Sequence, residues 1–254
     1  MNISLRTFLP LCLVVFLNFL SNDLLAQANE KAMLSIGSSY TYYVPGGDLD
    51  ERFGNFNALA LTPQVELKEK NWLLLAEGQF LFGNNITEPN LLSNLKSENG
   101  EVLDEDALPA QILYFSRGYS FSLGLGKRIY LEEDEKGFGL SLAVNAGFLQ
   151  HKIRIEHQNN RIPQLEGEYE KGYDRLCNGL MLTQKIGLFY TGRMYANNMK
   201  LELIFNQGFT QDRRDFNFDE RRKLDEKRLD FFSGLRFTWL LPIKRRIDDN
   251  FYIN

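Results

Sequence analysis

The two histidines of this sequence, His151 and His157, are the residue type best suited to acid–base catalysis. A catalytic histidine needs a nucleophile within reach and an acid that orients its ring. Neither histidine is followed within two residues by a serine, a threonine or a carboxylate, and two histidines alone do not complete a metal site. We therefore expect no catalytic residue, no metal site and no cofactor.

A cluster of acidic residues near the C-terminus could in principle attract Ca²⁺, which prefers carboxylate ligands. It consists of Asp212, Asp215, Asp219 and Glu220, and the arginines Arg213, Arg214, Arg221 and Arg222 interleave with it. Neighbouring basic side chains compete with a cation for the same carboxylates. The pattern therefore predicts self-paired surface charge and no calcium site.

Seven further charged residues share a pattern: each lies among glycine, serine and other small or polar residues on one face of a segment whose other face is apolar. They are Glu66, Glu77, Arg128, Lys185, Lys200, Glu202 and Arg236. Three acids against four bases are nearly balanced. What these side chains do depends on which face of each segment points inward.

Eight segments of the chain alternate apolar and polar residues with a period of two, which is typical of β-strands with one apolar face. In the clearest case, Phe138, Leu140 and Leu142 alternate with Gly139 and Ser141. A helix does not tolerate such a glycine content. The eight segments span residues 32–44, 58–67, 72–82, 118–131, 138–149, 179–191, 199–210 and 229–241.

A soluble β-sandwich or lipocalin-like barrel would also alternate, with its apolar face inward. Two features favour a membrane barrel with its apolar face outward. The charged residues of the polar face suit a narrow lumen, and aromatic residues gather near the strand ends, where interfacial girdles lie. These aromatics are Tyr42, Tyr43, Trp72, Phe80, Phe82, Tyr119, Tyr130, Tyr190, Phe209, Phe231 and Trp239.

The connections between the segments alternate between long and short. Residues 68–71, 132–137 and 192–198 form short turns, whereas 45–57, 83–117, 150–178 and 211–228 form long polar loops. Bacterial outer-membrane barrels have short periplasmic turns, long extracellular loops and an even number of strands. We therefore predict an all-β fold, an eight-stranded antiparallel transmembrane β-barrel with up-and-down topology, over residues 27–241.

The N-terminus reads as a cleavable signal peptide over residues 1–26, with Arg6 before an apolar run and small residues at Ala26 and Ala28. Its removal takes away one base and one acid, Arg6 and Asp23, so the net charge stays at -4 and indicates no nucleic-acid partner. Cys177 is then the last thiol, which excludes an intramolecular disulfide. Residues 242–254 are expected to form a periplasmic tail, whose Lys244, Arg245 and Arg246 would suit an acidic surface or lipid headgroups.

Gly234, Phe237 and Trp239 have the spacing G-x-x-F-x-W in the last segment. This resembles the terminal-strand signal that barrel-assembly machinery reads, although Phe232 stands where a polar residue is expected and the chain continues beyond the strand. The stretches 40–49, 150–155, 172–176 and 208–214, with 239–243 and 251–252, resemble a largely uncharacterised family of small barrels of Bacteroidetes-type outer membranes. Some barrels of that lineage accompany the type IX secretion and gliding apparatus. The resemblance implies a periplasmic or outer-membrane lipoprotein as a partner.

The interior of an eight-stranded barrel is only wide enough for side chains to fill it. We therefore expect the seven charged residues to form a paired network that plugs the lumen, with Glu202 within reach of Arg236 on the neighbouring strand. The predicted function is non-enzymatic, that of a structural or interaction component surrounded by outer-membrane lipid. The alternatives are an outer-membrane lipid-modifying enzyme and a narrow channel for small solutes.

Overall fold

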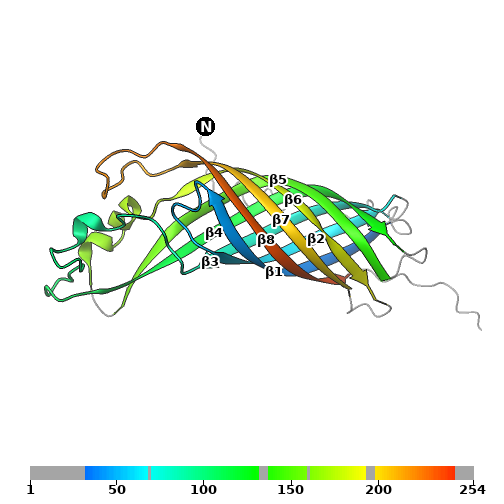
Figure 1. The fold of residues 1–254 in the computed structure, drawn as a ribbon, viewed down its shortest axis with the longest axis horizontal. Helices are drawn as coiled ribbons and strands as arrows, with labels where there is room; N and C mark the ends of the chain where they lie inside the picture. The colour runs from blue at the N-terminus through cyan, green and yellow to red at the C-terminus, as the bar shows by residue number, and fades with distance from the viewer. Residues whose placement is uncertain (1–31, 68–69, 132–136, 159–160, 193–197, 244–254) are drawn as a thin grey trace, which may run out of the picture.

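The computed structural model describes residues 32–67, 70–131, 137–158, 161–192 and 198–243. Eight strands follow one another and close into a single antiparallel barrel, in which each strand pairs with the next and the eighth pairs with the first (Figure 1). This confirms the predicted fold class. The strands are β1 (Ala32–Gly47), β2 (Phe56–Leu67), β3 (Trp72–Gly83), β4 (Gln111–Tyr130), β5 (Gly137–Gln158), β6 (Cys177–Thr191), β7 (Asn198–Asp212) and β8 (Lys227–Pro242).

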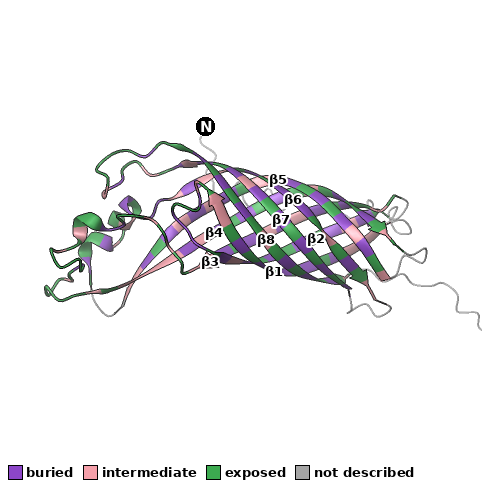
Figure 2. Ribbon diagram, viewed as in Figure 1, coloured by how far each residue is buried: buried purple, intermediate pink, exposed green. Residues whose placement is uncertain are grey.

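Most outward-pointing side chains of the barrel are apolar, and most inward-pointing ones are small or polar. Leu142 is 38% exposed whereas Ser141, the residue before it, is 1% exposed, and the alternation continues along every strand (Figure 2). A barrel in water would leave this apolar face exposed over most of its circumference, at a large cost in hydrophobic free energy. The outward face instead matches the hydrocarbon of a bilayer, so the barrel is a transmembrane one.

The strand ends joined by the long connections lie at one end of the barrel, and the strand ends joined by the short connections lie at the other (Figure 1). Ala32 pairs with Leu67, and Ser35 pairs with Pro242, so β1 begins and β8 ends at the short-turn end. The long connections contain the three 3₁₀ helices of the described residues, η1 (Ser93–Leu95), η2 (Pro163–Leu165) and η3 (Tyr169–Gly172). Throughout the described part of the chain, no helix is long and apolar enough to cross a membrane.

Two strands extend well beyond the predicted segments, and the predicted loops 83–117 and 150–178 are correspondingly shorter. β4 begins at Gln111 and β5 ends at Gln158, so these strands form a hairpin that rises beyond the rest of the barrel (Figure 1). In this extension the polarity of the two faces is reversed: Ile153 and Ile155 are buried, whereas Arg154 is exposed. We infer that β4 and β5 pass from the hydrocarbon into water here. Because the polarity of the faces reverses, the alternation in the sequence predicted strands that were too short.

Aromatic side chains fill part of the lumen. Tyr43, Phe56 and Phe232 pack together with ring centroids 5.0 to 5.6 Å apart. The expectation that Tyr43 and Tyr130 belong to the outer girdle is wrong. Tyr43 is fully buried and Tyr130 donates a hydrogen bond to a lumen carboxylate, because both residues have the inward parity of their strands.

Candidate functional site

Glu77 lies at the centre of the charged network inside the barrel. Its Oε2 atom is 2.5 Å from Nζ of Lys185 and 2.6 Å from Nη1 of Arg236. Thr62 donates a further hydrogen bond to the same oxygen at 3.2 Å. One carboxylate thus joins β2, β3, β6 and β8 across the lumen.

Arg236 crosses the lumen from β8 and uses its other N–H groups on neutral partners. Its Nε donates to Thr41 at 2.8 Å, and its Nη2 donates to Gln79 at 2.5 Å and to the Tyr43 hydroxyl at 3.2 Å. The expected partner, Glu202, is its register neighbour on β7. The carboxylate of Glu202 is instead 3.2 Å from Lys200, so the expected pair is replaced by Glu77–Arg236, since the long guanidinium reaches the far wall.

The remaining two of the seven residues form a separate pair nearer the short-turn end. Arg128 donates to Glu66 at 2.5 Å, and Tyr130 donates to the same carboxylate at 2.8 Å. The guanidinium of Arg128 also lies over the Phe189 ring, 4.9 Å from its centroid. All seven residues are buried, and each of the three acids has at least one basic partner.

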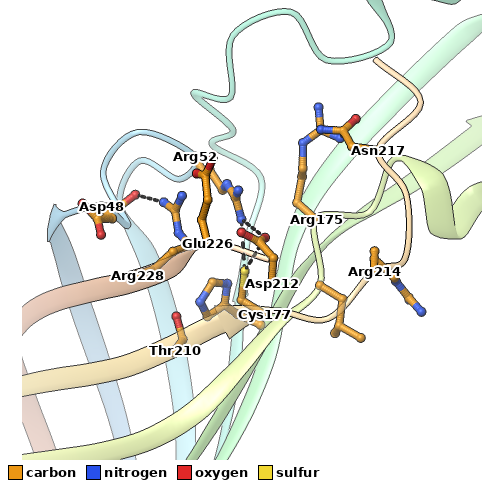
Figure 3. Close-up of polar contacts among 12 residues, drawn as sticks. Asp48, Arg52, Arg175, Cys177, Thr210, Asp212, Arg214, Asn217, Glu226 and Arg228 are labelled. Carbon is orange, nitrogen blue, oxygen red and sulfur yellow. Dashed lines mark hydrogen bonds and ion pairs between the residues drawn. The ribbon is translucent and has the colours of Figure 1, made fainter. Parts of the chain in front are cut away.

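A second charged cluster closes the long-loop end, and the sequence pattern did not identify it. Arg52 of connection 48–55 lies 2.9 Å from Asp212 at the end of β7 (Figure 3). Arg52 also lies 3.2 Å from Glu88 of connection 84–110. Arg175 of connection 159–176 lies 3.4 Å from Glu88 and 2.9 Å from Asp219 of connection 213–226. One chain of buried ion pairs therefore links all four long connections, and we call this cluster the loop cap.

Burial and charge act in opposite directions on the groups of the loop cap. Burial alone would lower the pKa of the Arg52 guanidinium, but Cys177 and Asp212 beside it raise that pKa above its ordinary value. Burial raises the pKa of the Glu88 carboxyl, and the nearby Arg52 and Arg175 oppose that rise. The Arg52 guanidinium therefore stays charged at every physiological pH.

A buried apolar cluster accompanies the loop cap. Leu92, Ile153 and Ile162 are fully buried in one cluster with Leu49 and Phe53. Three of the long connections and the extended β5 strand contribute to this cluster. The same cluster continues into the lumen through Phe56 and Phe232. Such burial is unusual for connections that only join strands.

The predicted self-pairing of the acidic cluster is only partly correct. Glu220 pairs with Arg222 at 2.6 Å, but Asp212 and Asp219 pair with the distant arginines of the loop cap, and Arg214 pairs with Asp174. Among the described residues, no three metal-binding side chains are placed to hold an ion together. The cluster fastens the loops to one another.

His151 lies buried between the lumen and the loop cap. Its Nε2 atom is 2.9 Å from Oδ2 of Asp230, and Thr210 donates to the same oxygen at 2.5 Å. Phe53 packs edge-on against the imidazole ring at 5.4 Å. The sequence pattern missed Asp230 as a partner because it lies on β8, far from His151 in the chain. The adjoining cavity of about 20 Å³ holds one water molecule at most and has no room for a lipid substrate.

The three residues of the proposed assembly signal lie on the strand that closes the barrel. Phe237 and Trp239 point outward and are 48% and 45% exposed. Gly234 has a packing reason of its own: a Cβ atom there would lie 2.3 Å from the carbonyl oxygen of Tyr42 and 2.6 Å from the Tyr43 ring. Recognition of these residues by assembly machinery stays a prediction.

No protein-family model and no curated protein matches this chain. Among solved structures it is similar to neisserial surface protein A, with 7% identity over 84% of this chain and 99% of that chain and a TM-score of 0.43. It is also similar to the attachment invasion locus protein Ail of Yersinia pestis in complex with the heparin analogue sucrose octasulfate (13% identity, 83% and 99% covered, TM-score 0.42). A third is the N-terminal β-barrel domain of Pseudomonas aeruginosa OprF (10% identity, 83% and 100% covered, TM-score 0.36). Because these TM-scores and sequence identities are low, the eight-stranded barrel rests on the strand pairing and not on these similarities.

Proposed function

We propose that this protein is a non-enzymatic outer-membrane barrel whose lumen is a structural plug and whose loop cap is a rigid surface for binding a partner. The observation that carries the proposal is the chain of buried ion pairs through Arg52, Glu88, Arg175, Asp212 and Asp219, which links all four long connections. Burying charges is costly unless their geometry is fixed. Such a network is useful where one arrangement of the loops has to be maintained.

The side chains that fill the lumen argue against a channel. The guanidinium of Arg236 reaches from β8 to residues of β3 and β1, and the aromatic layer of Tyr43, Phe56 and Phe232 lies above it on the long-loop side. A solute would have to displace both layers. The burial of His151, whose Nε2 is hydrogen-bonded to Asp230, argues against an enzyme.

In the proposed orientation the loop cap is extracellular and the short turns are periplasmic. The even number of strands and the meeting of β1 and β8 at the short-turn end support this. Residues 1–26 and 244–254 lie outside the described residues, so cleavage of the signal peptide and the periplasmic tail remain predictions. Association with a lipoprotein or with the type IX secretion and gliding apparatus remains a prediction from the sequence resemblance.

Two exposed aromatic side chains of the long connections that the loop cap joins are the best candidates for partner contact. Tyr169 is 62% exposed and Phe216 is 43% exposed, and both rings pack against Phe218 at centroid distances of 6.5 and 5.8 Å. Aromatic side chains held in one orientation are frequent binding hot spots, because little entropy is lost when they are covered.

The test is photo-cross-linking in intact cells with benzoyl-phenylalanine at Tyr169 or at Phe216. The matched control is the same residue at Phe138, which is 57% exposed at the short-turn end of the barrel. We expect both loop-cap positions to cross-link to one and the same protein and Phe138 to give no such product. The absence of a protein cross-link from both loop-cap positions would contradict a binding platform.

A further inference from the structure

The outer surface of the barrel has a groove where β6, β7 and β8 pass from the apolar band to the long-loop end. Its volume is about 510 Å³. The strand register puts Leu180, Phe209 and Leu229 in one row across the three strands, and Asn178, Gln211 and Lys227 in the next row toward the loops. All six have the outward parity of their strands, so the groove lies on the boundary between apolar and polar surface.

Three cationic side chains line this groove. Arg228 is buried and lies 3.6 Å from Glu51 and 3.7 Å from Asp230, whereas Arg213 and Lys227 are exposed. Arg213 donates from Nε to the Asn178 amide oxygen at 2.7 Å, which holds the guanidinium over the groove without neutralising it. Among the described residues, no carboxylate forms an ion pair with Arg213 or Lys227.

Two other basic residues on the outer face at this level are neutralised, whereas Arg117 donates only to the carbonyl oxygens of Gly83 and Ser116. Arg154 lies 2.8 Å from Glu156, and Lys152 lies 3.5 Å from Asp174. The one acid that lines the groove, Asp48, uses its carboxylate to accept a hydrogen bond from the backbone N–H of Leu229 at 2.7 Å, and its backbone oxygen accepts from Arg228 (Figure 3). The groove is therefore a place where positive charge is left available at the membrane boundary.

We propose that this groove binds the phosphate group of an anionic membrane lipid. The inference goes beyond the partner-binding role of the loop cap and depends only on the membrane position of the barrel. Arg213 and Lys227 would hold the phosphate, since guanidinium and ammonium groups form strong charge-assisted hydrogen bonds to phosphate oxygens. Phe209 and Leu229, 51% and 39% exposed directly below, would contact the acyl chains.

The test is native mass spectrometry of the detergent-purified full-length protein with phosphatidic acid and with phosphatidylcholine of the same acyl chains. We expect wild-type protein to retain phosphatidic acid in preference to phosphatidylcholine. Each basic residue near an anionic lipid surface contributes roughly fivefold in affinity, so Arg213→Gln combined with Lys227→Gln should weaken phosphatidic acid binding about 25-fold. The matched control, Lys152→Gln combined with Arg154→Gln, should leave binding unchanged. Both variants are first shown to be folded by their resistance to SDS before boiling.

Three results of the lipid and variant comparison would overturn the proposal. They are equal retention of the two lipids by the wild-type protein, unchanged phosphatidic acid binding by the folded Arg213/Lys227 variant, and an equal loss in the Lys152/Arg154 control. Inorganic phosphate distinguishes a lipid site from a free-phosphate site. At a concentration equal to that of the lipid, we expect inorganic phosphate not to displace phosphatidic acid, and displacement would rule out the lipid as the ligand.

Discussion

Replacing Glu77 by methionine should destabilise the barrel more than any other single change in the lumen. The carboxylate separates two cations, Lys185 and Arg236, whose nitrogen atoms lie 2.5 and 2.6 Å from the same oxygen. These two nitrogens are therefore at most about 5 Å apart. Without the carboxylate their repulsion amounts to ~3 kcal/mol at an effective dielectric constant of about 20. Removing one side of a buried ion pair typically costs ~3 to 5 kcal/mol, which agrees with this figure.

Removing the cationic partner by Arg236→Met should lower the stability of the barrel less than Glu77→Met, although it removes four hydrogen bonds. It leaves Glu77 paired with Lys185, and each lumen acid still has one base. Adding Lys185→Met to Glu77→Met should recover ~2 to 3 kcal/mol of the loss, because it removes the repulsion between the cations. As a control, Glu156→Met removes an exposed ion pair with Arg154 and should cost less than ~1 kcal/mol.

The assay measures the urea concentration at which half of the protein is unfolded in detergent. The fraction unfolded is read from the folded and unfolded bands in SDS gels. The expected order of destabilisation is Glu77→Met first, then the Glu77/Lys185 double variant and Arg236→Met, and finally Glu156→Met. If Glu77→Met were no more destabilising than Arg236→Met, or if Lys185→Met added to it gave no rescue, the reasoning about the central carboxylate would be refuted.

Three further predictions concern the outer face, the loop cap and the N-terminus. Leu123→Arg should cost ~2 to 4 kcal/mol because Leu123, 68% exposed, faces lipid; spin labels at Leu123 and Ser122 should report lipid and lumen respectively, and reversed environments would contradict the facing. Arg175→Met should leave the barrel resistant to SDS but make the long connections more sensitive to trypsin, and unchanged cleavage would show that the ion pairs do not hold the loops. N-terminal sequencing of the outer-membrane protein should begin at Gln27, and retention of Met1 in an inner-membrane fraction would contradict cleavage.

The strands could be predicted from the sequence because residues such as Leu142 and Ser141 alternate with the period of a β-strand. The alternation alone does not say which face points inward. The charged residues of the polar face and the alternating long and short connections indicated a membrane barrel. The extensions of β4 and β5 escaped the pattern because the facing of polar and apolar residues reverses after Leu149. There, Ile153 points inward as Ser141 does, although its chemistry matches the outward residues of the membrane band.

Partners across the lumen and between the loops could not be predicted from the sequence. Arg236 and Glu77 are on strands that are not neighbours, and only the diameter of the barrel brings them together. Arg52, Glu88 and Arg175 lie in connections without any periodicity, so nothing in their spacing separates them from ordinary surface charges. The loop cap is a product of tertiary packing.

Single-channel recording of the purified protein in a planar bilayer tests the plugged lumen most directly. We expect the inserted protein to give no discrete current steps, because the Glu77 network and the aromatic layer above it leave no continuous path. Regular current steps from the wild-type protein, altered in size by Arg236→Met, would contradict the plug and identify the lumen as a conduit.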